Sequence, residues 1–288
     1  MKISTEIWSA AKIIGEEKAI EYYAKAGFDA WDFSMFEMCR YDRVANCVLP
    51  NSHPLFGNEW EAFAKRLARV ASDCGIFCNQ SHAPFPSKYA DVRSYFKRAI
   101  ECTAIAGGDI CVIHPDNDKG ASENAEMYYE ILDFAKSCNV RIATENMWNW
   151  DKEKDESSFA ACATPESFCE HIDIINDPSF VACLDIGHAE MRGSQTSAVE
   201  MIRKLGGNRL KALHIHDNNK WKDSHQLPFT MDVDFVPIVD ALREIEYDGI
   251  FTLEADQWLT GRDAENIFDG IKEMQATARR LADMFEAK

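Results

Sequence analysis

Several short apolar segments of this sequence end in a histidine or a carboxylate. The segment from Lys211 to His216 reads as a strand, and His214, His216 and Asp217 close it. Polar groups of this kind are costly at the end of a buried strand unless they bind something. The same pattern closes five further segments, at Glu145, at Asp185 with His188, at Glu254, at His82 and at His114. We expect these strand ends to meet at one place.

Four of these side chains, Glu145, Asp185, His214 and Glu254, form a predicted metal site. Three carboxylates and one imidazole suit one divalent ion that accepts oxygen-rich coordination, such as Mn²⁺ or Mg²⁺, with Zn²⁺ and Co²⁺ as alternatives. Without a cation, three carboxylates so close together would repel one another. A bound metal would polarise a substrate carbonyl or hydroxyl and acidify the neighbouring C–H, and a ligating glutamate with a free oxygen would act as the base.

A second group of polar side chains is expected around this site, as further metal ligands or as groups that hold substrate hydroxyls. Its members are His82, His114, His188, His216, Asp223 and His225. A lone histidine at a strand end is usually a packed one, but six of the eight histidines follow the pattern. Four aromatic residues near segment ends, Trp148, Trp150, Phe85 and Trp258, are expected to line a sugar pocket. Plain packing is the alternative for these aromatics.

Strand-like and helical segments alternate along the whole chain. The expected strands cover residues 3–8, 30–35, 76–81, 109–114, 140–145, 181–185, 210–216 and 250–254. The expected helices cover 16–25, 59–74, 88–106, 122–137, 198–205, 234–246 and 264–285, and one more opens at Thr164-Pro165. Ser122 is a candidate N-cap. The segments 36–58, 148–163 and 217–232 read as long loops.

This alternation predicts an α/β protein with a parallel sheet covered by helices, and eight units in 288 residues predict a closed (β/α)8 barrel. An open doubly wound sheet would call for a glycine-rich turn, and the sequence contains no G-x-G-x-x-G or Walker A motif. The strands of a barrel open their carboxyl ends on one face, which explains the convergence of the ligands. We expect a single domain over residues 1–288.

The charge and composition limit the partners. The 48 acidic residues outnumber the 31 basic ones, the net charge is −17, and no basic run exceeds two residues, which argues against nucleic acid. The apolar runs are too short to span a bilayer, and the first residues resemble a strand rather than a signal peptide. The ten cysteines form no C-x-x-C pair and are expected to be reduced, which predicts a cytoplasmic protein. A small neutral or metal-chelating molecule fits best as the partner.

Four motifs carry a family resemblance: Thr144-Glu145-Asn146, Leu184-Asp185-Ile186-Gly187-His188, His214-Ile215-His216-Asp217 and Thr252-Leu253-Glu254. The chain resembles the xylose isomerase-like barrel superfamily, in its sugar phosphate isomerase/epimerase branch, which is related to the ketose 3-epimerases. The resemblance implies that Glu145, Asp185, His214 and Glu254 bind the metal and that His188 faces the substrate. It also implies that Glu145 and Glu254 exchange protons on opposite faces of an enediolate.

The sequence therefore predicts a divalent-metal-dependent isomerase or epimerase of a small sugar or sugar derivative. A metal-dependent lyase or dehydratase of a keto sugar or cyclic polyol is one alternative. The apurinic endonucleases of the same superfamily bind three zinc ions, and their ligand set also finds matches here, at His82, His114, Glu145, Asp185, His188, His214, Asp223, His225 and Glu254. The net charge of −17 argues against that alternative, and so does His216, which departs from the endonuclease pattern. The sequence leaves open the identity of the sugar, whether it is phosphorylated and whether the protein is a homo-oligomer. Lys220, Lys222 and Arg262 are candidate contacts for a phosphate.

Overall fold

Eight parallel strands form a closed ring in this computed structural model, which describes residues 1–287. The ring strands are β1 (Ile3–Thr5), β2 (Ala30–Ser34), β5 (Phe77–His82), β6 (Ile110–Val112), β7 (Arg141–Glu145), β10 (Phe180–Asp185), β11 (Leu210–His214) and β12 (Phe251–Leu253). Six of them pair in the order β11-β10-β7-β6-β5-β2, and β1 pairs with β12. Parallel bridges between Glu6 and Asp32 and between Ile215 and Leu253 close the ring. The predicted (β/α)8 barrel is confirmed.

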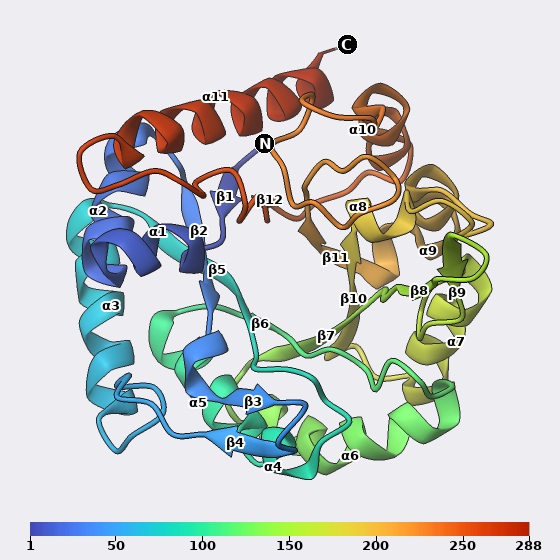
Figure 1. Ribbon diagram of the computed structural model, residues 1–288, viewed down its shortest axis with the longest axis horizontal. Helices are drawn as coiled ribbons and strands as arrows, with labels where there is room; N and C mark the ends of the chain where they lie inside the picture. The colour runs from blue at the N-terminus through green and yellow to red at the C-terminus, as the bar shows by residue number, and fades with distance from the viewer. Residues whose placement is uncertain (288) are drawn as a thin grey trace.

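Eight helices surround the ring (Figure 1). They are α2 (Glu16–Ala26), α3 (Trp60–Cys74), α5 (Phe96–Ala106), α6 (Ala121–Ser137), α7 (Pro165–Ile175), α9 (Ala198–Arg209), α10 (Phe235–Glu244) and α11 (Ile267–Glu286). Helix α7 begins as its sequence predicts, because Thr164 accepts a hydrogen bond from the Ser167 backbone N–H and Pro165 occupies the first turn. No helix among residues 1–287 is long and apolar enough to cross a membrane.

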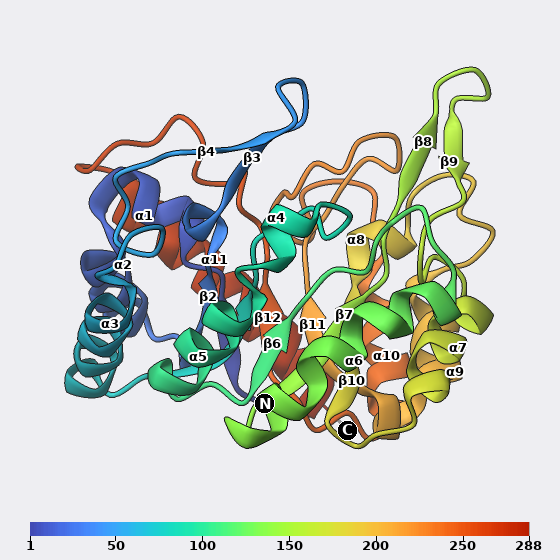
Figure 2. The same cartoon turned by 90° about the horizontal axis from the view of Figure 1, so that it is seen from below.

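Two antiparallel hairpins stand above the carboxyl ends of the barrel strands. The first consists of β3 (Arg40–Asp42) and β4 (Cys47–Leu49), and the second of β8 (Asn149–Asp151) and β9 (Glu156–Ser158). Figure 2 shows both hairpins rising from the same end of the barrel, opposite the chain termini. They occupy two of the segments that were expected to be loops. Both hairpins therefore frame the face on which the strand ends converge.

The structure corrects three local predictions. Trp8 does not extend the first strand but begins helix α1 (Trp8–Ile14), because the Glu6 carboxylate accepts the Ser9 backbone N–H at 3.0 Å and turns the chain into a helix. The expected helix 88–106 is two helices, α4 (Ala90–Arg93) and α5, and the Ser94 hydroxyl binds the Asp91 carbonyl at the break. Helix α6 begins at Ala121 after Gly120, so Ser122 is not its N-cap.

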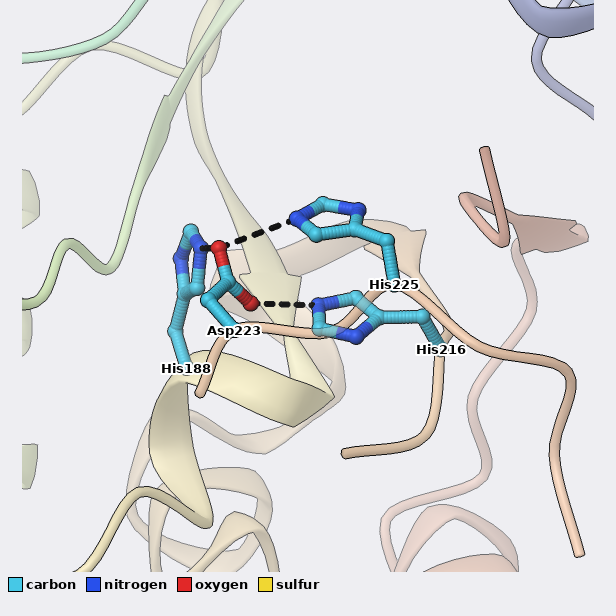
Figure 3. Close-up of side chains that lie close together, drawn as sticks. All are labelled: His188, His216, Asp223 and His225. Atoms are coloured by element: carbon cyan, nitrogen blue, oxygen red, sulfur yellow. Dashed lines mark hydrogen bonds and ion pairs between the residues drawn. The ribbon is translucent and has the colours of Figure 1, made fainter. Parts of the chain in front are cut away.

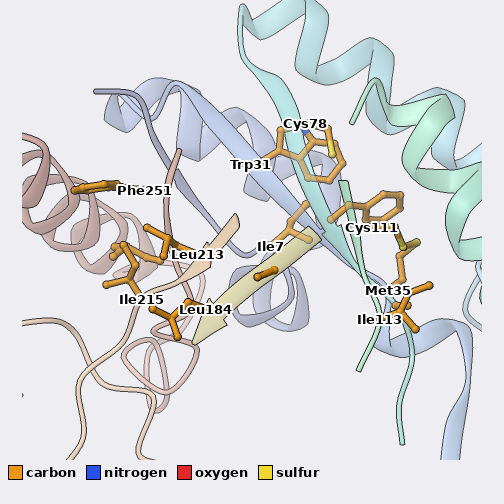
Figure 4. Packing of buried hydrophobic residues seen from close by; sticks show 14 of the residues in the cluster. Ile7, Trp31, Met35, Cys78, Cys111, Ile113, Leu184, Leu213, Ile215 and Phe251 are labelled. Carbon is orange, nitrogen blue, oxygen red and sulfur yellow. The ribbon is translucent and has the colours of Figure 1, made fainter. Parts of the chain in front are cut away.

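Alternation along the strands separates the core from the site. Leu184 and Leu213 point outwards into the large apolar cluster between strands and helices, part of which Figure 4 shows. Their neighbours Asp185 and His214 therefore point into the barrel. A smaller apolar cluster lies on this inner face, two or four residues before the site residues of β6, β7, β10 and β11, and consists of Ile110, Val112, Ala143, Val181, Cys183 and Ala212. All ten cysteines are free.

Candidate active site

The four side chains of the predicted metal site lie together at the carboxyl ends of the strands. Glu145 is the last residue of β7, Asp185 of β10 and His214 of β11, while Glu254 directly follows β12. One ligand atom from each lies within 4.8 Å of those from the others, and all four residues are buried. His214 Nδ1 lies 3.1 Å from Glu145 Oε2 and 3.5 Å from Glu254 Oε2. Asp185 Oδ1 accepts the backbone N–H of His188 at 2.7 Å.

His82 and His114 adjoin this group through Glu145. Their Nε2 atoms lie 2.8 Å apart, and His114 Nε2 is 3.3 Å from Glu145 Oε2. His82 Nδ1 points away from the cluster to the carbonyl of Ala83 at 2.9 Å, which leaves Nε2 directed at the site. His82, Glu145 and His214 also have ligand atoms within 4.8 Å of one another. Glu145 is thus shared by two candidate metal-binding groups.

A separate cluster consists of His188, His216, Asp223 and His225 (Figure 3). The Asp223 carboxylate lies between the three imidazoles, and its Oδ2 is 3.0 Å from His225 Nε2 and 3.3 Å from His188 Nε2. Asp223 Oδ1 is 3.4 Å from His216 Nε2. The rings of His216 and His225 stack with centroids 3.9 Å apart. The loop after β11 supplies His216, Asp223 and His225, and the short helix α8 (Ile186–Ala189) supplies His188.

The charges in these clusters shift one another's ionisation. Burial favours the neutral form of Glu145, but His214 and His114 outweigh it and lower its pKa well below the usual value. Burial raises the pKa of Glu254 well above its usual value. Burial also opposes protonation of His188, yet Asp185 and Asp223 raise its pKa to about 10. The carboxylates therefore attract positive charge, and the pKa values of the two glutamates shift in opposite directions.

The donor set fits a divalent cation. Asp185 Oδ2 is buried and has no hydrogen-bond partner among residues 1–287, which is costly for a carboxylate oxygen unless a cation binds it. Three carboxylates and one imidazole are donors that Mn²⁺ and Mg²⁺ accept. A divalent cation would neutralise the repulsion among these carboxylates. Glu145, Asp185, His214 and Glu254 are thus the residues that could hold it.

One cavity of about 590 Å³ opens onto both clusters. Its inner part is lined by site residues, namely His82, His114, Glu145, His188, Asp223, His225 and Glu254. Three of the four predicted aromatics, Phe85, Trp148 and Trp150, line it as well, and Trp148 Nε1 donates to Asp223 Oδ2 at 3.1 Å. Trp258 does not line the cavity; its indole N–H binds Glu273 instead. The cavity thus combines a polar floor with aromatic walls.

Several other charged residues near the strand ends do not belong to the site. Asp217, from the same motif as His214, accepts backbone N–H groups of Thr230, Met231 and Val233 and shapes the loop before α10. Of the three candidate phosphate contacts, Lys220 lies 3.4 Å from Glu190 and Arg262 pairs with Glu273 at 2.5 Å. None of the three lines the cavity, Lys222 included.

Two buried acids near the site are absent from the predicted set. Asp32 lies in β2, and its Oδ2 is 3.4 Å from His214 Nε2 and accepts from Gln80 Nε2 at 2.9 Å. Glu6 follows β1 and, like Asp32, is almost fully buried. The sequence does indicate a buried acid at Asp32, because this carboxylate stands between apolar residues in Ala30-Trp-Asp-Phe. A buried carboxylate needs a partner, which points to a site nearby. Asp32 lies where an outer partner of a metal-binding histidine is usually found.

Comparison with known proteins agrees with the barrel fold. The model of the family described as xylose isomerase-like TIM barrel matches residues 20–281, so the chain belongs to this family. An uncharacterised protein of Methanocaldococcus jannaschii is 28% identical over 212 residues, which is 66% of this chain. The match spans 66% of that relative's length, slightly under two thirds.

Solved structures share the fold over nearly the whole chain. A D-tagatose 3-epimerase-like protein superposes with a TM-score of 0.70 at 20% identity and covers 98% of this chain and 99% of its own. A 3-keto-D-glucoside 4-epimerase of E. coli gives a TM-score of 0.68 at 14% identity and covers 97% of this chain and 99% of its own. At these identities, the likeness is one of fold.

Proposed function

We propose that this protein is a divalent-metal-dependent isomerase or epimerase of a small sugar or sugar derivative. The observation that carries the proposal is the pair Glu145 and Glu254. Both line one cavity, both have an oxygen within 3.5 Å of His214 Nδ1, and their pKa values shift in opposite directions. Two such carboxyl groups at one cavity suit the removal of a proton from carbon and its return, because one can accept the proton and the other can supply it.

The chain's own residues divide the work as follows. A divalent cation held by Glu145, Asp185, His214 and Glu254 would polarise the carbonyl of a keto sugar and acidify the neighbouring C–H. Glu145, ionised at the end of β7, removes that proton, and the sugar becomes an enediolate. Glu254 follows β12, three strands further around the ring. It returns a proton from a different side, which inverts the carbon. His114 and His188 border the cavity and hold hydroxyl groups.

The names of the two solved structures support this proposal, since one is called a D-tagatose 3-epimerase-like protein and the other a 3-keto-D-glucoside 4-epimerase. The test is a screen of ketoses and keto sugars with chelator-stripped protein, alone and with Mn²⁺, Mg²⁺, Co²⁺ or Zn²⁺. We expect epimer or isomer formation only after a metal is added. A folded protein that converts no sugar with any of the four ions would contradict the proposal, and dehydrated products would favour a lyase.

A specific observation also supports a second candidate, a three-metal phosphodiesterase like the apurinic endonucleases. The clusters at His82 and at Asp223 add two candidate metal groups to the first. The net charge of −17 opposes it, because a phosphodiester backbone is gripped by clustered Lys and Arg. Metal content per chain and incision of an abasic-site duplex separate the two candidates. We expect no incision at catalytic protein levels; specific incision would promote the second candidate.

A further inference from the structure

The cavity extends well beyond the side chains that could perform the chemistry. Its volume of about 590 Å³ lies in the middle of the range for drug-sized ligands, roughly 300–1,000 Å³, and a single sugar ring is a smaller molecule. The residues that could act on a reacting carbon form only its floor. Most of the remaining lining comes from the loop after β5, the loop after β6 and the two hairpins. A ligand that fills the cavity therefore needs a second part beyond the reacting ring.

The outer part has walls suited to a sugar ring or a similar flat unit. Trp150 on β8 and Phe85, which is 37% exposed, both line the cavity. Phe85 is held edge-on against Phe36, with ring centroids 5.2 Å apart. Asn117 donates to the Trp148 carbonyl at 3.1 Å and to Asn149 Oδ1 at 2.9 Å, which fixes the start of the hairpin that carries Trp150. Fixed aromatic faces beside amide groups bind rings that are apolar on their faces and polar at their edges.

The charges of the outer part do not suit a phosphate. Its two cations are Arg43 and Lys88, and Lys88 Nζ lies 3.7 Å from Asp118 Oδ2. Asp256 also lines the cavity, in addition to the three acids on the floor. Outside the floor, the two lining acids, Asp118 and Asp256, equal the two cations in number. A neutral second unit fits this balance better than a phosphoryl group.

We propose that the outer cavity between the two hairpins is a subsite for a second ring, and that the substrate is a glycoside with a keto group on its reacting ring. This inference rests on the proposed sugar epimerase function and narrows its substrate class. The reaction balances without a redox partner, because one C–H bond beside the keto carbon breaks and one re-forms on the other face. The glycosidic bond stays intact. An oxidation of a ring hydroxyl must supply such a substrate.

The test compares one-ring and two-ring forms of the same keto sugar. We expect kcat/KM for a two-ring keto-glycoside to exceed that for the methyl glycoside by at least about tenfold, as usual for an added group in a fitted pocket. Trp150→Ala should reduce this ratio toward one. Phe159→Ala is the matched control, because Phe159 lies beside the same hairpin, is 65% exposed and does not line the cavity; this variant should keep the ratio. Trp150→Phe, which keeps an aromatic face, should keep most of it.

A binding measurement on chelator-treated protein provides a readout independent of turnover. A two-ring glycoside without a keto group should bind wild type more tightly than its methyl counterpart, and Trp150→Ala should remove the difference. Equal binding and equal kcat/KM for the two forms, with clear turnover of both, would overturn the subsite and leave the epimerase proposal standing. Preferred turnover of a phosphorylated single ring would also overturn it. Failure to convert any sugar with any metal would overturn both proposals.

Discussion

Gly187 lies directly against the imidazole of His216. A Cβ atom built on Gly187 would overlap Cε1, Nε2 and Nδ1 of that ring. The backbone of Gly187 has no positive φ, so close packing, and not backbone conformation, is what requires glycine here. The contact holds His216 Nε2 at 3.1 Å from Asp185 Oδ1. A glycine in one motif thus positions a histidine in another.

Gly187→Ala should therefore disturb the cluster around Asp223. We expect a loss of about 1–3 kcal/mol in the free energy of unfolding, the usual cost of overpacking. Urea denaturation of the metal-free protein measures it. Gly57→Ala is the control, because the added Cβ would meet only the Pro54 carbonyl oxygen, at 4.0 Å. Wild-type stability for Gly187→Ala would show that His216 moves aside without cost.

Asp32→Asn should weaken metal binding without removing a ligand. Asp32 lies 3.4 Å from His214 Nε2, and we infer that it orients the ring so that Nδ1 faces Glu145. Loss of such a partner usually costs 10–100-fold in metal affinity. Competitive metal titration measures the change, and Asp91→Asn on the exposed face of α4 is the control. The effect should vanish when His214 is already replaced; an undiminished effect in the double variant would contradict the inferred role.

Glu6 makes stability depend on pH. Burial, with the charge of Asp256 adding to it, raises the pKa of Glu6 from 4.5 to about 7. Between these values, the folded protein keeps a proton that the unfolded chain releases, so the free energy of unfolding falls as pH rises from 4.5 to 7 and then levels off. The loss amounts to about 3 kcal/mol, at roughly 1.4 kcal/mol per pKa unit.

Glu6→Gln should remove that part of the slope, because Gln keeps an acceptor for the Ser9 N–H and has no proton to lose. Urea denaturation at several pH values from 4.5 to 8 measures the slope for the variant and for wild type. Glu130→Gln, on the exposed side of α6, should keep the wild-type slope. Parallel curves for Glu6→Gln and wild type would show that Glu6 ionises normally in the folded protein.

The barrel and the strand-end residues could be predicted because they depend on local patterns. Along β10 and β11, Leu184 and Leu213 face the helices, so the next residues, Asp185 and His214, face inwards. The places of Asp32 and Glu6 could not be predicted, since the charged groups that lie near them in the fold, His214 and Asp256, are distant in the chain. The two hairpins were also missed, because three-residue strands carry too little periodicity to stand out in a polar segment.

Glu145→Gln and Glu254→Gln should each remove an acid–base group and keep a weak ligand oxygen. We expect each variant to retain most of its metal and to lose at least about 10²-fold in turnover, as is usual for a general base. Metal analysis alongside steady-state kinetics separates the two effects. Glu265→Gln, in the exposed loop before α11, serves as the control. A variant that loses its metal completely would be a ligand variant and would not support the acid–base role.

The most direct test of the account is the fate of the substrate proton in deuterated water. Two glutamates that remove and return a proton exchange it with solvent, so product made by the wild-type protein should carry deuterium at the reacting carbon. NMR or mass spectrometry of the product measures this. Product formed at the normal rate without solvent deuterium would contradict the account, because it would indicate a direct hydride shift between carbons and would leave Glu145 and Glu254 as metal ligands only.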